Sequence, residues 1–305
     1  MLHRLPFRAM GGEMLAILEG NTDSPPAILD EVPGWFEDWE QTLSRFRADS
    51  ELSRLNKTYD QPVEVSDTLW DVFQYALSAE TITNGLVTPT VLDAMLEAGY
   101  DQNFETLPRH QQKNERSVST AINLLSFVLW DEKSQTICLP QGVRLDFGGV
   151  AKGWAAHQVA ERLQEHGSAL MNAAGDIAIS GALTSGAAWQ IGVRNPFVQG
   201  TDFETLNLNR CGIATSGKDR RRWTKNGSPR HHIIDPYTGQ PAETNVMTAT
   251  IIAPTVMEAE AAAKAVLILG GEEGLKWIES DPVLAGIIVL ENGQTLYSQR
   301  ISEYL

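Results

Sequence analysis

The sequence is poor in cysteine, in positive charge and in long apolar runs. Cys138 and Cys211 form no CxxC pair and have no metal-binding spacing, so both are expected to be small buried side chains rather than nucleophiles. No segment reaches the ~18 uninterrupted apolar residues of a membrane helix, so no membrane span is predicted. The net charge of −15 argues against a nucleic-acid or anionic-membrane partner, and a phosphate-bearing ligand would need a local basic pocket.

The first 20 residues lack the apolar core and the small-residue cleavage site of a secretion signal, and no cysteine near the start could carry a lipid. A cytoplasmic location is therefore expected. The 305 residues, 42% of them hydrophobic, allow one large domain or two small ones. The polar and charged stretch 101–119 is the best place for a boundary between lobes.

Helical and strand-like patterns are mixed along the chain, and several hairpins are present. Apolar periodicity and caps predict helices over residues 34–56, from Ser66 or Asp67 to about Asn84, after Pro89, over 150–167, and from Pro254–Thr255 to Gly270. Strands or hairpins are predicted over 13–19, 127–140, 169–181, 189–193, 212–217, 247–253 and 284–299. This mixture favours an α+β architecture over a doubly wound parallel sheet.

The segment LDFGGVAKG, residues 145–153, places an acid, two glycines and a lysine where an apolar stretch meets a helix. Helix-start amides attract anions, glycines let a ligand approach, and Lys152 adds a positive charge. Asp146 would repel a phosphate unless a metal, a ligand hydroxyl or a base nitrogen occupies it. The segment therefore suggests a ligand with both an anionic part and a hydrogen-bond donor; the alternative is a glycine turn with a capping aspartate.

Three further polar stretches interrupt apolar strands, at residues 172–176, 215–219 and 231–239. Polar residues at strand ends often gather at one edge of a sheet, where sites form. His232 is a candidate general base or phosphate ligand, whereas Asp235 more often holds a turn of this composition. Ser216 and Gly217 could donate to a phosphate, but Ser216 lacks the Gly-x-Ser-x-Gly turn of an esterase nucleophile.

Eight segments, in order over nearly the whole chain, give the sequence a family resemblance. The segments are AMGG (9–12), SRFRADSELSRLN (44–56), GLVTPTV (85–91), LDFGGVAKGWAAHQVAERL (145–163), NAAGDIAISG (172–181), WQIGVRNP (189–196), IATSG (213–217) and HHIIDPYTGQPA (231–242). With these segments the sequence resembles the ApbE family, the FAD:protein FMN transferases.

The resemblance implies a single ApbE-like domain over residues 1–305, an α+β fold with mixed or antiparallel sheets and packed helices in two interlocked lobes, with FAD in the cleft. It implies that the FMN half of FAD moves onto a threonine or serine hydroxyl of an acceptor flavoprotein and that AMP is released. It also implies Mg²⁺ that bridges the pyrophosphate and the protein.

The resemblance assigns roles to individual residues. His232 would take the proton from the attacking hydroxyl, Gly149 would lend a carbonyl to the metal, and Asp176 would support the site. Contacts with FAD are expected from Met10, Thr88, Asp146, Lys152, Asp176, Ser216, Gly217 and Ile234.

The sequence departs from the family at the metal site. Glu260 and Lys264 stand where the family has a metal-binding aspartate and threonine, and a protonated lysine cannot ligate Mg²⁺. Three interpretations are open: the Lys264 ammonium takes the metal's place, held by Glu260; the site is damaged and only binds flavin; or the two residues form an ordinary surface pair. Thr88 also replaces an aspartate, and Ala174 replaces the first glycine of Gly-Gly-Asp.

Three functions follow. The leading hypothesis is an active flavin transferase with an altered metal site. The second is a non-catalytic relative that binds and carries FAD. The third is a hydrolase that uses His232 and Asp235, for which the chain has no nucleophile motif.

Overall fold

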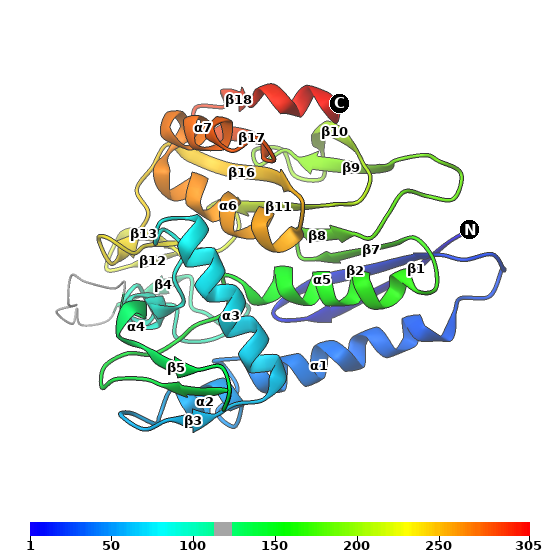
Figure 1. Ribbon diagram of the computed structural model, residues 1–305. Helices are drawn as coiled ribbons and strands as arrows, with labels where there is room; N and C mark the ends of the chain where they lie inside the picture. The colour runs from blue at the N-terminus through cyan, green and yellow to red at the C-terminus, as the bar shows by residue number, and fades with distance from the viewer. Residues whose placement is uncertain (113–123) are drawn as a thin grey trace. The chain divides into compact units, whose positions relative to one another are not determined.

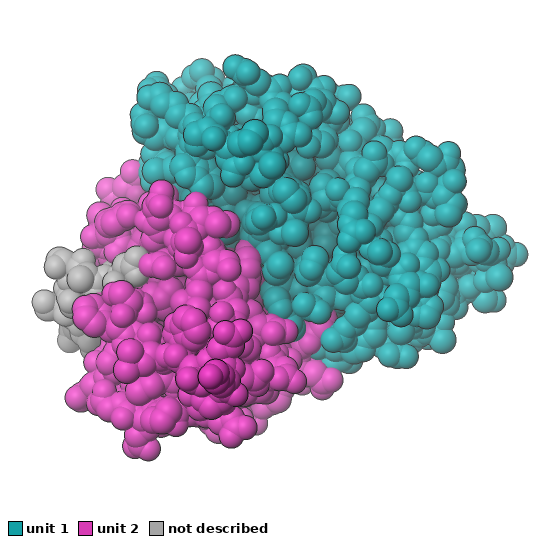
Figure 2. Space-filling view, in the orientation of Figure 1, with its two compact units in different colours: residues 1–36, 152–219, 244–305 teal, residues 37–151, 220–243 magenta. Residues whose placement is uncertain are grey.

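The computed structural model describes residues 1–112 and 124–305 (Figure 1). The chain divides into two compact units, coloured separately in Figure 2. The first unit comprises residues 1–36, 152–219 and 244–305, and the second comprises 37–151 and 220–243. Of the stretch 101–119, expected to hold a lobe boundary, residues 101–112 lie within the second unit and 113–119 lie outside the described residues. The single domain over residues 1–305 stays a prediction.

An eight-stranded sheet, antiparallel at every pairing, is the framework of the first unit. Three of its inner strands are buried at every residue, as expected for strands covered on both faces. In spatial order the strands are β1 (Leu2–Ala9), β2 (Gly12–Glu19), β7 (Ala169–Ala173), β8 (Asp176–Ile179), β11 (Cys211–Gly217), β16 (Val246–Ala253), β17 (Ala285–Leu290) and β18 (Thr295–Tyr297).

Two helices pack against the inner strands of this sheet. Helix α6 (Val256–Leu269) contacts β11 and β16, and α7 (Gly271–Ser280) contacts β17. Helix α6 begins with a capping box, in which Thr255 and Glu258 satisfy each other's main-chain N–H groups. Its small side chains let it approach its neighbours closely; the buried alanines are Ala259, Ala261, Ala262, Ala263 and Ala265.

An apolar cluster connects the sheet to the antiparallel pair β9 (Trp189–Arg194) and β10 (Asp202–Leu208) and to the short helix η4 (Gln299–Glu303). Its members include Ile17, Leu170, Trp189, Leu206, Ile213, Ile252, Ile287 and Ile301. The strands of the sheet therefore pack against α6 and α7 and also against β9, β10 and η4.

Helix α5 (Ala151–Gln164) follows the glycine segment. It begins where the N–H groups of Val150 and Ala151 both donate to the carbonyl of Phe147. Its apolar stripe is buried, as the periodicity predicted, with Val159 and Leu163 fully inaccessible to solvent.

The second unit contains helices and short sheets. Its helices are α1 (Val32–Leu43, which begins in the first unit), α2 (Glu51–Leu55), α3 (Asp67–Ile82) and α4 (Leu92–Glu97). Its sheets are β3–β6–β5 (Val63–Glu64, Thr136–Cys138, Leu129–Asp131), β13–β12–β4 (Ser228–His231, Arg222–Lys225, His110–Gln111) and β14–β15 (Ile234–Asp235, Gln240–Pro241). The short helices are η1 (Ala27–Glu31, in the first unit), η2 (Pro89–Val91) and η3 (Leu125–Phe127).

The structure differs from the elements predicted from the sequence in several places. The helix predicted over 34–56 is two helices, because Ser50 accepts a hydrogen bond from the N–H of Ser53 and so caps a new helix, α2. Strand β1 was not predicted at all. It lies at the edge of the sheet, where Pro6 is tolerated and the apolar pattern is weak. Among the described residues, no helix is both long and apolar enough to cross a membrane.

Two tight turns lie side by side at one end of the large sheet. Met10–Gly11 connects β1 to β2, and Ala174–Gly175 connects β7 to β8, with all four residues at positive φ. The N–H of Ala174 donates to the carbonyl of Glu13, which ties the second turn to β2. Left-handed backbone is unfavourable for methionine and alanine, so these turns carry strain that the paired strands impose.

Replacing Ala174 with glycine is therefore expected to stabilise the protein. Ala174 has φ of 58°, and relief of this strain should raise the free energy of unfolding by about 0.5–1 kcal/mol. Urea denaturation of Ala174→Gly would measure the change. Ala178→Gly is the matched control, because Ala178 lies inside β8 and glycine should weaken that strand. Equal losses in both variants would contradict the assignment of strain to the turn.

Candidate functional site

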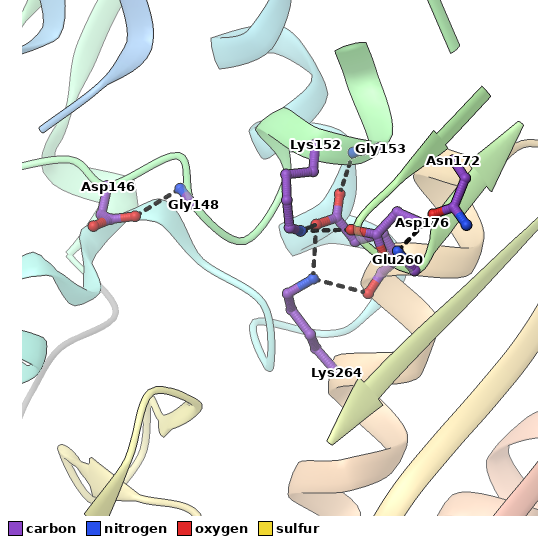
Figure 3. Close-up of polar contacts among 9 residues, drawn as sticks. Asp146, Gly148, Lys152, Gly153, Asn172, Asp176, Glu260 and Lys264 are labelled. Atoms are coloured by element: carbon purple, nitrogen blue, oxygen red, sulfur yellow. Dashed lines mark hydrogen bonds and ion pairs between the residues drawn. The ribbon is translucent and has the colours of Figure 1, made fainter. Parts of the chain in front are cut away.

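Four charged side chains of the first unit form one network (Figure 3). The Lys152 ammonium lies 2.5 Å from Asp176 Oδ2 and 3.0 Å from Glu260 Oε1. The Lys264 ammonium lies 3.0 Å from the same Glu260 oxygen. Two ammonium groups therefore share one carboxylate oxygen, and a second carboxylate holds one of them.

Three elements bring these side chains together. Lys152 lies in the first turn of α5, Asp176 is the first residue of β8, and Glu260 and Lys264 lie one turn apart on α6. Asp176 directly follows the strained Ala174–Gly175 turn, so the hairpin sets its position. The sequence placed Glu260 and Lys264 on one helix face, and the family resemblance assigned Lys152 and Asp176 to the same FAD site, but the ion pairs among the four were not predicted.

Gly153 is essential to the close approach of α5 and α6. Its N–H donates to Glu260 Oε2 over 2.9 Å, and a Cβ at this position would lie 2.6 Å from the same oxygen. Only glycine leaves room for the carboxylate while still supplying the hydrogen bond. Both oxygens of Glu260 are thus satisfied by groups of the protein.

The network is buried unevenly. The side chain of Glu260 is 0% exposed, whereas those of Lys152 and Lys264 are 15% and 16% exposed. Burial pushes the pKa of Glu260 upward, but the charges and hydrogen bonds of Lys152 and Lys264 outweigh it and hold that pKa below its ordinary value. Burial raises the pKa of Asp176 and lowers that of Lys264, because each charged form loses water.

These residues do not fit a magnesium ion. Mg²⁺ requires oxygen ligands at about 2.1 Å in octahedral geometry. The oxygens of Glu260 are occupied by two ammonium groups and the N–H of Gly153, and Asp176 Oδ2 is occupied by Lys152. Across residues 1–112 and 124–305, no three His, Cys, Asp or Glu side chains are grouped to hold a metal. Glu260 and Lys264, expected at the metal position, instead form an ion pair.

Asp146, in the second unit, is held by two groups of the protein. Its Oδ1 accepts a 2.6 Å hydrogen bond from the N–H of Gly148, and its Oδ2 lies 2.5 Å from Arg45 Nε. Asn56 exchanges two hydrogen bonds with the main chain of Leu145, the residue before Asp146, and so fixes its position. Asp146 therefore caps a glycine turn, which was the alternative considered for this segment. A contact between Asp146 and flavin stays a prediction.

Arg45 is a residue that sequence reasoning missed. Its guanidinium donates to the carbonyl of Tyr100 over 2.8 Å and lies over the rings of Phe46 and Tyr100, 4.1 and 4.8 Å from their centroids. Its side chain is 7% exposed. The sequence indicated a role for Arg45 only through its place in segment 44–56, which is one of the segments that carry the family resemblance.

The two neighbouring histidines have different surroundings. His231 Nε2 bonds the carbonyl of Ala242 over 3.0 Å, and its Nδ1 accepts from the N–H of Ile233, so both ring nitrogens serve the main chain. The ring of His232 packs edge-on against Tyr100, with centroids 6.5 Å apart. Asp235 Oδ1 accepts from the N–H of Tyr237, which is the turn-holding role expected for it.

The other predicted residues of the second unit are Thr88, Gly149 and Ile234. Thr88 is buried and caps η2, and the carbonyl of Pro89 accepts the N–H of Asp146 over 2.8 Å, so the Thr88 segment lies against Asp146. Gly149 lies in the turn before α5. Ile234 is 5% exposed and packs in a cluster with Tyr100 and Trp223.

The remaining residues predicted from the sequence belong to the first unit. Met10 occupies the first position of the β1–β2 turn. Ser216 and Gly217 end β11, and Ser216 is buried. Cys138 and Cys211, expected to be buried, are only partly buried. Burial raises the pKa of the Cys211 thiol to about 12, which disfavours the nucleophilic thiolate.

The first unit thus combines an antiparallel sheet, helices packed against it, and a network of lysines and carboxylates at the start of α5. This fold and this site can be compared with those of known proteins. A model of the ApbE family matches residues 11–288, and the chain belongs to that family. This confirms the resemblance seen in the sequence.

Relatives and solved structures agree with this assignment. The FAD:protein FMN transferase of Haemophilus influenzae is 29% identical over 274 residues, which cover 87% of this chain and 79% of that protein. That of Vibrio cholerae is 29% identical over 265 residues, covering 85% and 78%. The crystal structure of the ApbE protein of Thermotoga maritima matches with a TM-score of 0.86 and 26% identity, covering 100% of this chain and 99% of that one. The predicted α+β fold is confirmed.

Removal of the Arg45 guanidinium should destabilise the protein strongly. Arg45→Met leaves the carboxylate of Asp146 buried without its cation, which is expected to lower the free energy of unfolding by about 3–5 kcal/mol. Arg210→Met is the control, since Arg210 and Glu161 form an exposed ion pair and their loss should cost less than about 1 kcal/mol. Chemical denaturation compares the two, and similar small losses would contradict a structural role for Arg45.

The contribution of Glu260 to stability should depend on pH. Because its pKa is lower in the folded state than its ordinary value of 4.5, its stabilisation is fully present above that value and is lost as the pH falls through the folded-state pKa. The difference in free energy of unfolding between wild type and Glu260→Gln should shrink as the pH is lowered below 4.5. Glu273→Gln, at an exposed pair with Lys276, should change little. A difference for Glu260→Gln that grows toward acid pH would refute this account.

Proposed function

We propose that this protein is an FAD:protein FMN transferase. It moves the FMN half of FAD onto a threonine or serine hydroxyl of an acceptor flavoprotein and releases AMP. The observation that carries the proposal is the match to two FAD:protein FMN transferases over more than three quarters of their length, together with the ApbE family model over residues 11–288. The buried lysine–carboxylate network supports it, because a pyrophosphate under attack needs cations beside it.

The reaction forms one bond and breaks one. The acceptor's hydroxyl oxygen attacks the phosphorus of the FMN half, and the bond from that phosphorus to the bridging oxygen of the pyrophosphate breaks. AMP leaves with the bridging oxygen. In this proposal His232 takes the hydroxyl proton, and Lys152 and Lys264 neutralise the charge that develops on the phosphate oxygens.

The other residues bind and position FAD in this proposal. Lys152 also holds Asp176, which keeps the ammonium in place. The contacts proposed for flavin, nucleotide and phosphates come from Met10, Thr88, Asp146, Ser216, Gly217 and Ile234. No step is assigned to Mg²⁺ or to the carbonyl of Gly149, since Glu260 and Lys264 do not fit the metal. The cytoplasmic location stays a prediction.

A flavin assay tests the proposal. The purified protein and FAD would be added to an extract of source cells lacking its gene. We expect a protein band whose flavin fluorescence survives denaturation, and AMP in equal amount to the bound flavin. His232→Ala should lower the rate by about 10²- to 10⁴-fold, because the hydroxyl loses its base. His166→Ala, at an exposed histidine after α5, is the matched control and should match wild type.

FAD that stays intact on wild-type protein through a long incubation, with no AMP and no covalent flavin, would contradict the transferase and leave a flavin carrier. Equal rates in His232→Ala and wild type would remove His232 from its assigned role.

A further inference from the structure

In the network of Lys152, Asp176, Glu260 and Lys264, the two lysine side chains are more exposed than the two carboxylates. The carboxylate of Glu260 is fully buried and the side chain of Asp176 is 6% exposed, whereas both lysine side chains keep about 15% of their surface accessible. A ligand that reaches this part of the first unit therefore has more access to the lysine side chains than to either carboxylate. The accessible surface is suited to an anion.

The same arrangement excludes the interpretation of Glu260 and Lys264 as an ordinary surface pair. An exposed pair one helical turn apart stabilises by only a few tenths of a kcal/mol and is readily broken. Here the carboxylate has no contact with solvent and is bound by two ammonium groups and a main-chain N–H. Lys264 is thus held in place by a fixed, buried counter-charge.

Lys264 also retains capacity to bind. Its ammonium has three N–H groups. Within the described chain, its contacts are with the Glu260 carboxylate and with the Glu260 main-chain carbonyl, 3.3 Å away. Two of the three N–H groups are thereby accounted for, and the third can donate to a phosphate oxygen at the partly exposed end of the side chain.

We propose that Lys264, with Lys152 beside it, supplies the positive charge that neutralises the FAD pyrophosphate, so that transfer proceeds without a divalent metal. This inference rests on the proposed function. The bonds formed and broken are those of the proposed reaction: the hydroxyl oxygen bonds the FMN phosphorus, the proton passes to His232, and AMP departs with the bridging oxygen. The lysines form no covalent bond, and their positive charges are supplied by the protein itself.

Metal removal gives the first test. FAD, source-cell extract and purified protein would be incubated with EDTA or with excess Mg²⁺, and AMP would be quantified. We expect equal rates in the two conditions. Turnover that disappears in EDTA and returns with Mg²⁺ would overturn the inference. Absence of AMP in both conditions would instead refute the proposed function, and the binding test below would still decide whether Lys264 holds the anion.

Binding of inorganic pyrophosphate gives the second test, and it needs no turnover. Titration calorimetry in EDTA should show binding to wild type, and Lys264→Met should weaken it by about 10- to 100-fold, because a charge-assisted hydrogen bond is lost. Lys264→Arg keeps the charge and should retain most of the affinity. Lys276→Met is the matched control, since Lys276 lies in an exposed lysine–glutamate pair of α7. Equal affinity in wild type and Lys264→Met would overturn the inference.

A double variant provides the converse experiment. Glu260→Asp with Lys264→Thr installs the pair that the family resemblance places at these positions. Turnover of this variant should require Mg²⁺ and disappear in EDTA. Full turnover of the double variant in EDTA would show that Lys264 is not needed as the cation, and would overturn the inference. Thermal unfolding of each variant confirms that it is folded before it is assayed.

Discussion

The buried carboxylate of Glu260 is the interaction on which the rest of the candidate site depends. An isolated charge without solvent costs several kcal/mol, so the fold has to surround it with compensating groups. Helix α5 supplies the N–H of Gly153 and the ammonium of Lys152, and α6 supplies Lys264. The same groups that compensate the Glu260 charge also join α5 to α6. A change in the packing of the two helices would therefore also change the electrostatics of the site.

The second unit meets a similar demand differently. Asp146 is nearly as buried as Glu260, and Arg45 compensates it. Here the cation is enclosed, because Phe46 and Tyr100 lie against the guanidinium. A charge covered in this way orders the main chain around it and offers little to a ligand. In the first unit the lysine side chains are 15% and 16% exposed, against 7% for Arg45, which makes that network the better candidate for direct contact with phosphate.

Much of the fold could be predicted from local patterns. The capping residues Ser66 and Thr255 and the turn at Gly293 mark their elements because helix starts and tight turns are governed by neighbouring residues. Contacts between distant segments could not be predicted in this way. Lys152 and Glu260 are 108 residues apart, and no spacing rule relates them. The family resemblance indicated which segments matter, and only the structure shows that their charged side chains form one network of ion pairs.

Gly153 has a consequence for how such a site changes in evolution. The space beside it accommodates the length of a glutamate, because Glu260 Oε2 lies only 2.6 Å from where a Cβ of residue 153 would be. A shorter acid at position 260 would leave a void there and withdraw the counter-charge from Lys264. Loss of the lysine alone would leave Glu260 with fewer cations. Each single replacement is therefore expected to destabilise the network while the other residue is unchanged. Lineages that have acquired the pair are expected to keep both residues together.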